Sequence, residues 1–260
     1  MNILFIGDIV GRPGRYLLSE RLKSFLQENN IDFCIANAEN VANGSGITEN
    51  TYKKLLHYGV DAITSGDHIY RNRDILNFIQ DAEYLLRPAN LPGEALGRGS
   101  GVFQTENGPK IGIMNLQGRI FMNPIDCPFK AAETCLKTLG RQADMIIVDF
   151  HAEATSEKVA MGRFLDGKVS AVLGTHTHIQ TADECVLPGG TGYITDVGMT
   201  GPYDSVLGRE VKPVLKKLIT GMPARFDVAK NDLRMSGAIV DIDEETGRAR
   251  SVKRVSVNVA

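Results

Sequence analysis

Short apolar runs alternate with segments of helical periodicity along most of the chain. Residues 2–7 (NILFIG) form a continuous apolar run ending at a Gly-Asp pair, which is typical of a buried strand. Residues 13–29 carry leucines and a phenylalanine at helical spacing, with a proline in the first turn. The same patterns predict further strands at residues 31–38, 60–65, 101–105, 110–116, 144–150 and 169–174, and further helices at residues 48–58, 72–80, 128–142 and 156–165.

The C-terminal part of the chain has a different pattern. Residues 235–243 and 250–259 alternate polar and apolar positions, and the segment EETG at 244–247 separates them, which predicts a β-hairpin. Strands alternating with helices indicate a layered α/β fold that finishes in antiparallel strands. Because no repeat or linker interrupts the pattern, we expect residues 1–260 to form a single domain.

Composition narrows the classes of partner. The net charge of −2 provides no basic field for nucleic acid, so RNA recognition would have to be local to a site. No apolar run approaches the ~20 residues of a membrane span, and the N-terminal run has no preceding basic segment. We therefore expect a cytoplasmic protein with no membrane partner, whose four widely spaced cysteines are reduced thiols.

Polar side chains follow five of the predicted strands directly. Each sits where open α/β sheets build their sites, at the carboxyl edge. Four of the five histidines of the chain fall in these loops, whereas His57 is expected on the surface of a helix. The residues in question are Asp8, Glu39, Asn40, Asp67, His68, His151, His176 and His178.

Carboxylate and imidazole donors together suit iron, manganese or zinc better than calcium or magnesium. The seven of these residues other than His68 exceed the needs of one tetrahedral ion and suffice for two ions bridged by a carboxylate. In an extended segment, His176 and His178 would point to opposite sides of the backbone, so that each could face a different ion.

Each residue also has a structural interpretation without a metal. Asp8 could cap a loop, Glu39 and Asn40 could form a polar turn, and Asp67 could begin the next helix as its N-cap. His68 could be a solvated loop residue, and His151 a hydrogen-bonded core residue. These interpretations would all have to hold at once for the metal hypothesis to fail.

The motifs resemble those of the calcineurin-like metallophosphoesterases. The matches are Gly7-Asp8, Gly66-Asp67-His68, His151 and His176-Thr177-His178. Val10 stands where the first family motif has histidine, and Asn37-Ala38-Glu39-Asn40 replaces the second motif. Both departures, with the strings NAENVANGSGIT, DFHAEATSEK, GTHTHIQTAD and TDVGMTGPYDS, are similar to the YmdB-like family of bacterial phosphodiesterases over essentially the whole chain.

This resemblance implies a four-layer α/β/β/α metallophosphoesterase sandwich with a dinuclear, iron-containing centre. By position, Asp8, Glu39, Asn40 and His178 would bind one metal ion. Glu39 would bridge to a second ion held by Asp67, His151 and His176. His68 would be the general acid, and the substrate would be a cyclic nucleotide, chiefly 2′,3′-cyclic AMP.

Asp67 departs from the asparagine of most family members. The added negative charge is expected to tighten metal binding and to slow turnover near neutral pH. Two other functions stay open, namely a regulatory metal-binding scaffold and a phosphomonoesterase or nuclease acting on RNA. We also expect a homo-oligomer.

Overall fold

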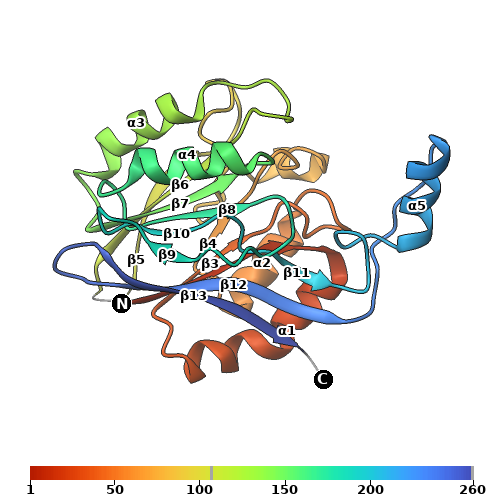
Figure 1. The fold of residues 1–260 in the computed structure, drawn as a ribbon, viewed down its shortest axis with the longest axis horizontal. Helices are drawn as coiled ribbons and strands as arrows, with labels where there is room; N and C mark the ends of the chain where they lie inside the picture. The colour runs from red at the N-terminus through yellow and green to blue at the C-terminus, as the bar shows by residue number, and fades with distance from the viewer. Residues whose placement is uncertain (106–107, 259–260) are drawn as a thin grey trace.

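Two β-sheets packed face to face form the centre of the molecule, and helices cover their outer faces (Figure 1). The computed structural model describes residues 1–105 and 108–258. Within these residues the sheets have seven and six strands. The layers therefore follow the order helix, sheet, sheet, helix, which confirms the predicted four-layer α/β sandwich.

The first sheet has the strand order β2-β11-β12-β1-β3-β4, with β13 paired to β12. Strands β1, β3 and β4 are parallel, whereas β12 joins β1 antiparallel. The bounds are β1 (Asn2–Ile6), β2 (Asp8–Ile9), β3 (Phe33–Asn37), β4 (Ala62–Thr64), β11 (Met199–Pro202), β12 (Leu233–Ile242) and β13 (Ala249–Asn258).

The second sheet has the order β5-β6-β7-β8-β10-β9 and is parallel from β6 to β10. Its two edge strands, β5 and β9, pair antiparallel with their neighbours. The bounds are β5 (Ser100–Gln104), β6 (Lys110–Gln117), β7 (Met145–His151), β8 (Ala171–Thr175), β9 (Cys185–Val186) and β10 (Gly192–Ile194).

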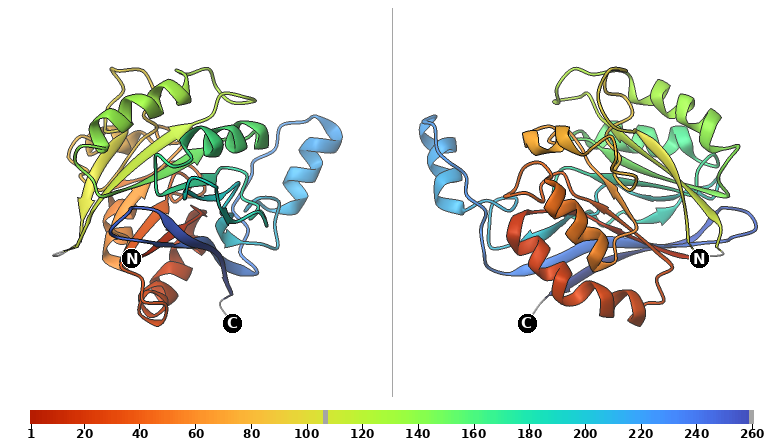
Figure 2. Two further views of the ribbon diagram at one scale, coloured as in Figure 1. Left: turned by 60° about the vertical axis from the view of Figure 1, so that its left-hand side comes forward. Right: turned by 180° about the vertical axis from the view of Figure 1, so that it is seen from behind.

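Helices α1 (Gly11–Glu28) and α2 (Glu49–Tyr58) pack on the first sheet, and α3 (Pro128–Leu139) and α4 (Thr155–Leu165) pack on the second. Helix α5 (Val211–Thr220) projects away from the sandwich in every view (Figure 2). No helix in the described part of the chain is long and apolar enough to span a membrane.

The continuous apolar run of β1 is explained by its burial on both faces. Leu4 and Ile6 pack toward α1 and α2, whereas Ile3 and Phe5 pack between the two sheets. This alternation follows from the two-residue period of a strand, and a strand covered on both faces needs apolar side chains at every position. The shared cluster between the sheets supports a single domain over residues 1–260, which stays a prediction.

The predicted elements agree with the structure to within a few residues, with one exception. The helix expected at residues 72–80 is wrong, because the segment forms only a short 3₁₀ helix, η1 (Arg73–Asn77). Phe78 ends it with a φ of −136°, outside the helical range. The predicted hairpin is confirmed as β12 and β13, although its expected last residue, 259, lies outside the described residues.

Candidate metal centre

The segments that follow three strands of the first sheet bring candidate side chains to one edge. Asp8 follows β1, Glu39 and Asn40 follow β3, and Asp67 and His68 follow β4. Because these strands are parallel, their carboxyl ends lie at the same edge of the sheet. Glu39 and Asn40 are buried, as is Asp8, whose exposed fraction is 0%.

The second sheet delivers three histidines to the same place. His151 is the last residue of β7, and His176 and His178 follow β8, the parallel neighbour of β7. The φ angles of His176 and His178 are 100° and 65°, in the left-handed region that side chains other than glycine rarely adopt. The extended segment expected at residues 176–178 is therefore wrong, and the loop after β8 is held in a strained conformation.

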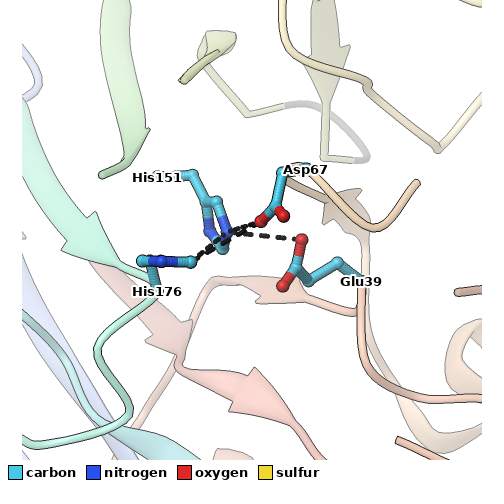
Figure 3. Close-up of side chains that lie close together, drawn as sticks. All are labelled: Glu39, Asp67, His151 and His176. Carbon is cyan, nitrogen blue, oxygen red and sulfur yellow. Dashed lines mark hydrogen bonds and ion pairs between the residues drawn. The ribbon is translucent and has the colours of Figure 1, made fainter. Parts of the chain in front are cut away.

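Four of these side chains point toward one another (Figure 3). Glu39, Asp67, His151 and His176 each offer one ligand atom, and these atoms lie within 4.8 Å of one another. The Nε2 atom of His151 lies 3.3 Å from Glu39 Oε2 and 3.3 Å from Asp67 Oδ1. This group corresponds to the second metal site that the sequence predicts.

The residues predicted for the first metal site lie beside this group. His178 Nε2 is 3.8 Å from Asp8 Oδ1 and 3.3 Å from Asn40 Nδ2. Asn40 Oδ1 lies 2.8 Å from His68 Nδ1. To bind an ion beside His178 through its oxygen, the Asn40 amide would have to turn over, so its role as a ligand stays a prediction.

Each histidine of the centre has a partner that orients its ring. Thr175 Oγ1 donates its proton to Asp149 Oδ1 at 2.7 Å, so it accepts from His151 Nδ1 at 2.9 Å. His176 Nε2 lies 3.1 Å from Glu153 Oε2, and His178 Nδ1 donates to the carbonyl of Leu207 at 3.1 Å.

These partners identify which nitrogen of each ring is free to bind an ion. They leave His151 Nε2, His176 Nδ1 and His178 Nε2 facing the carboxylates, as is usual for histidines that bind metals. The sequence alone did not predict these partners. One signal was present, because Asp149, the acceptor for Thr175, lies two residues before His151 in β7 and therefore on the same face of the strand.

Burial and charge shift the pKa values of two acidic candidate ligands in opposite directions. Burial opposes ionisation of Glu39, but the neighbouring His151 and His68 outweigh it and hold the pKa of Glu39 well below its usual range. Burial raises the pKa of Asp8, and the charges of His178 and His151 offset this only in part. A nearby cation would stabilise the ionised form of a carboxylate buried in this way.

The two facing histidines also have opposite shifts. Burial disfavours the charged form of His151, but Glu39, Asp67 and Asp8 together raise its pKa well above the usual value. Burial, followed by the charge of His151, lowers the pKa of His176 to about 4. Since His176 Nδ1 and His151 Nε2 are only 3.0 Å apart, a proton or another cation is needed between them.

A separate observation also indicates that these residues suit a metal ion. Asp8 Oδ1 is buried and has no hydrogen-bond partner among the residues that the structure describes. A buried carboxylate oxygen without a donor is costly, and a cation would satisfy it. The imidazole and carboxylate donors are those that transition metals accept.

Gly66 makes the close approach between the two sheets possible. A Cβ atom at this position would lie 2.2 Å from the ring of His151 and 2.5 Å from Glu39 Oε2. Glycine-rich segments elsewhere near the site also serve tight packing, since a Cβ at Gly7 or Gly14 would meet the backbone oxygens of Gly198 and Thr200. His57 is exposed on α2 as predicted, and the four cysteines are free.

The chain is similar to known proteins over nearly its whole length. A family described as "YmdB-like protein" matches residues 4–255. A protein of Bacillus subtilis strain 168 named "2′,3′-cyclic-nucleotide 2′-phosphodiesterase" is 46% identical over 258 residues, which are 99% of this chain and 97% of the relative.

Two solved structures share the whole fold. A hypothetical protein from Thermus thermophilus has a TM-score of 0.93 at 38% identity, and the alignment covers 99% of both chains. A phosphatase from Mycoplasma pneumoniae has a TM-score of 0.93 at 34% identity, covering 99% of this chain and 93% of the other.

Proposed function

Because this chain belongs to the YmdB-like family, we propose that it is a dinuclear metal-dependent phosphodiesterase acting on cyclic nucleotides, with 2′,3′-cyclic AMP as the expected substrate. The relatives named as a phosphodiesterase and a phosphatase support a hydrolase of phosphoric esters. The single observation that carries the proposal is the convergence of Glu39, Asp67, His151 and His176 within 4.8 Å.

The ligand assignment follows the two groups of side chains. Asp8, Glu39, Asn40 and His178 would hold one ion, and Asp67, His151 and His176 would hold the other with Glu39 shared between them. When bound, the ions would supply positive charge to the phosphoryl oxygens and activate a water. Iron is the expected metal, and manganese or zinc would also suit these donors.

His68 is the proposed general acid. Its side chain is 27% exposed, so it can meet a substrate, whereas the neighbouring Glu39 is buried. Its Nδ1 lies 2.8 Å from Asn40 Oδ1 and 3.4 Å from Glu39 Oε1, so an acceptor remains beside Nδ1 when the Asn40 oxygen turns to an ion, and Nε2 is left to donate a proton. In hydrolysis of a cyclic phosphate, water oxygen bonds to phosphorus, one P–O bond to the ribose breaks, and the departing oxygen takes the proton of His68.

Elemental analysis of freshly purified protein, together with hydrolysis assays, tests the proposal. We expect about two transition-metal ions per chain, and loss of activity toward bis-p-nitrophenyl phosphate and 2′,3′-cyclic AMP on chelation. Fewer than one ion, with no activity restored by iron, manganese or zinc, would contradict it. A preference for phosphomonoesters or for longer RNA would retain the centre and change the substrate.

A scaffold role is distinguished from catalysis in cells. The His68→Ala variant should present the same surface as the wild type, so a phenotype that the variant fails to restore requires hydrolysis. Full restoration by the variant would favour a regulatory metal-binding scaffold. A cytoplasmic location also stays a prediction.

A homo-oligomer stays a prediction as well, and α5 supports it. Leu218 and Ile219 on this projecting helix are 74% and 79% exposed. Apolar side chains exposed to this degree on one element favour an association surface. Light scattering after size exclusion should give a multiple of 28.3 kDa for the wild type and a smaller mass after Leu218→Lys and Ile219→Lys. A monomeric wild type would refute it.

A further inference from the structure

A buried lysine lies behind the metal-site loop and has no part in the proposed chemistry. Lys158 of α4 has a side-chain exposure of 1%. Its Nζ atom donates to the carbonyl of Thr175 at 2.7 Å and to Asp196 Oδ2 at 2.6 Å. Asp196 is also fully buried, so the ion pair is shielded from bulk solvent. Burying such a pair is costly, and an apolar side chain of similar size would fill the same space.

The carboxylate of Asp196 gathers donors from the loop that carries the two ligand histidines. Its Oδ2 accepts from the backbone N–H of Thr177 at 3.1 Å and from Thr177 Oγ1 at 2.8 Å, in addition to Lys158. Its Oδ1 accepts from the N–H of Gly198 at 2.9 Å. With four donors, the carboxylate has a single fixed orientation.

Thr177 is the residue between the two strained positions. His176 and His178 have φ angles of 100° and 65°, a conformation that persists only where surrounding contacts enforce it. The contacts at Asp196 act on the peptide between these two residues. Lys158 donates to the carbonyl of Thr175, the residue before His176. The hydroxyl of Thr175 also orients His151.

We propose that Lys158, Asp196 and Thr177 form a clamp that fixes the backbone between His176 and His178, and thereby sets the positions of both imidazoles for metal binding. The three are positioning residues and touch neither metal nor substrate. The inference rests on the proposed metal centre. On this inference, the protein retains the energetically costly buried ion pair because it increases metal affinity, and not for the stability of the fold alone.

Substitution of Thr177 tests the clamp with little change in shape. Thr177→Val keeps the volume and removes the hydroxyl donor, whereas Thr177→Ser retains the donor. The readout is the dissociation constant for Mn²⁺, measured on metal-free protein by competition with a chelator, together with the Tm of the metal-free protein. We expect Thr177→Val to weaken Mn²⁺ binding by about 10–100-fold, the usual effect of losing a partner that orients a metal ligand. Thr177→Ser should bind Mn²⁺ as tightly as the wild type does.

Thr191 provides a matched control. It is fully buried and its hydroxyl donates to the carbonyl of Val169 at 2.7 Å, outside the clamp. Thr191→Val should lower the Tm and leave Mn²⁺ affinity unchanged. If Thr177→Val behaves in the same way as Thr191→Val, the clamp is overturned and Asp196 is merely structural. If the wild type itself binds no Mn²⁺, iron or zinc, the proposed function fails and the clamp fails with it.

A double variant tests whether Lys158 acts through the same carboxylate. Lys158→Met should also weaken Mn²⁺ binding. Adding Thr177→Val to it should cost less affinity than Thr177→Val costs alone, because contacting residues in one network are not additive. Independent losses, with the fold-changes multiplying, would show that the lysine and the threonine do not form one unit.

Discussion

Gly66→Ala is expected to damage the metal centre without unfolding the protein. Gly66 does not adopt a positive φ, so the backbone itself tolerates alanine. The new methyl group, however, would lie 2.2 Å from His151 Cδ2 and Nε2. Real Cβ atoms essentially never approach other atoms closer than 3.0 Å, so the ring must retreat.

The size of the effect follows from this overlap. The ring of His151 would have to move by about 1 Å, and Glu39 Oε2, at 2.5 Å from the same methyl group, would also have to move. Overpacking of a buried site typically costs about 1–3 kcal/mol of stability. A displacement of about 1 Å at a reacting centre can cost on the order of 100-fold in rate. We therefore expect a modest fall in Tm and a loss of phosphodiesterase activity of about two orders of magnitude.

Three measurements on one preparation test this reasoning. Differential scanning calorimetry gives the Tm, chelator competition gives the Mn²⁺ dissociation constant, and bis-p-nitrophenyl phosphate gives the rate. Gly93→Ala is the matched control, because no atom of the described residues lies within 4 Å of a Cβ at that position and its φ is not positive. Unchanged metal affinity and rate in Gly66→Ala would refute the assignment of His151 and Glu39 to the centre.

Three further predictions follow from the geometry. His68→Ala should lose about 10²–10⁴-fold in rate while retaining both metal ions, and loss of metal on elemental analysis would show that His68 is a ligand. Asp67→Asn should weaken metal binding and turn over faster near neutral pH at full metal occupancy, and an equal or lower rate would count against the idea. Since Glu39, Asp67 and Asp8 raise the pKa of His151, the metal-free ring keeps its proton to a higher pH than an ordinary histidine and must lose it to bind an ion. Metal affinity should therefore rise by up to about tenfold per pH unit below that pKa, with proton release in weakly buffered calorimetry, and a pH-independent affinity would contradict the prediction.

The layered fold was predictable because its central strands are buried on both faces. Such strands need apolar residues at each position, and runs like NILFI in β1 are therefore visible in the sequence. The short strands β10 and β11 gave no such signal. Met199–Pro202 in β11 has only four residues, and its pairing with β12 depends on chain segments more than thirty positions away.

The clustering of the candidate ligand residues was predictable for a related reason. Asp8, Glu39 and Asp67 each follow a parallel strand, so topology alone brings them to one edge. Family motifs added the pairing of Glu39 with both ions, which stays a prediction. What the motifs could not supply was the side of each ring that faces the centre, because this depends on partners such as Glu153 and Leu207.

The buried ion pair shows why the remaining features of the site are visible only in the structure. Lys158 and Asp196 are 38 positions apart, and a lysine within a helix ordinarily indicates a solvated face. Here α4 turns Lys158 inward, onto the loop that follows β8, where the ammonium group meets both Thr175 and Asp196. A sequence pattern records charge and periodicity, but not the loop geometry that makes a buried lysine favourable. The strained φ angles of His176 and His178 explain why a lysine is buried here, since a loop of this conformation needs contacts that hold it in place.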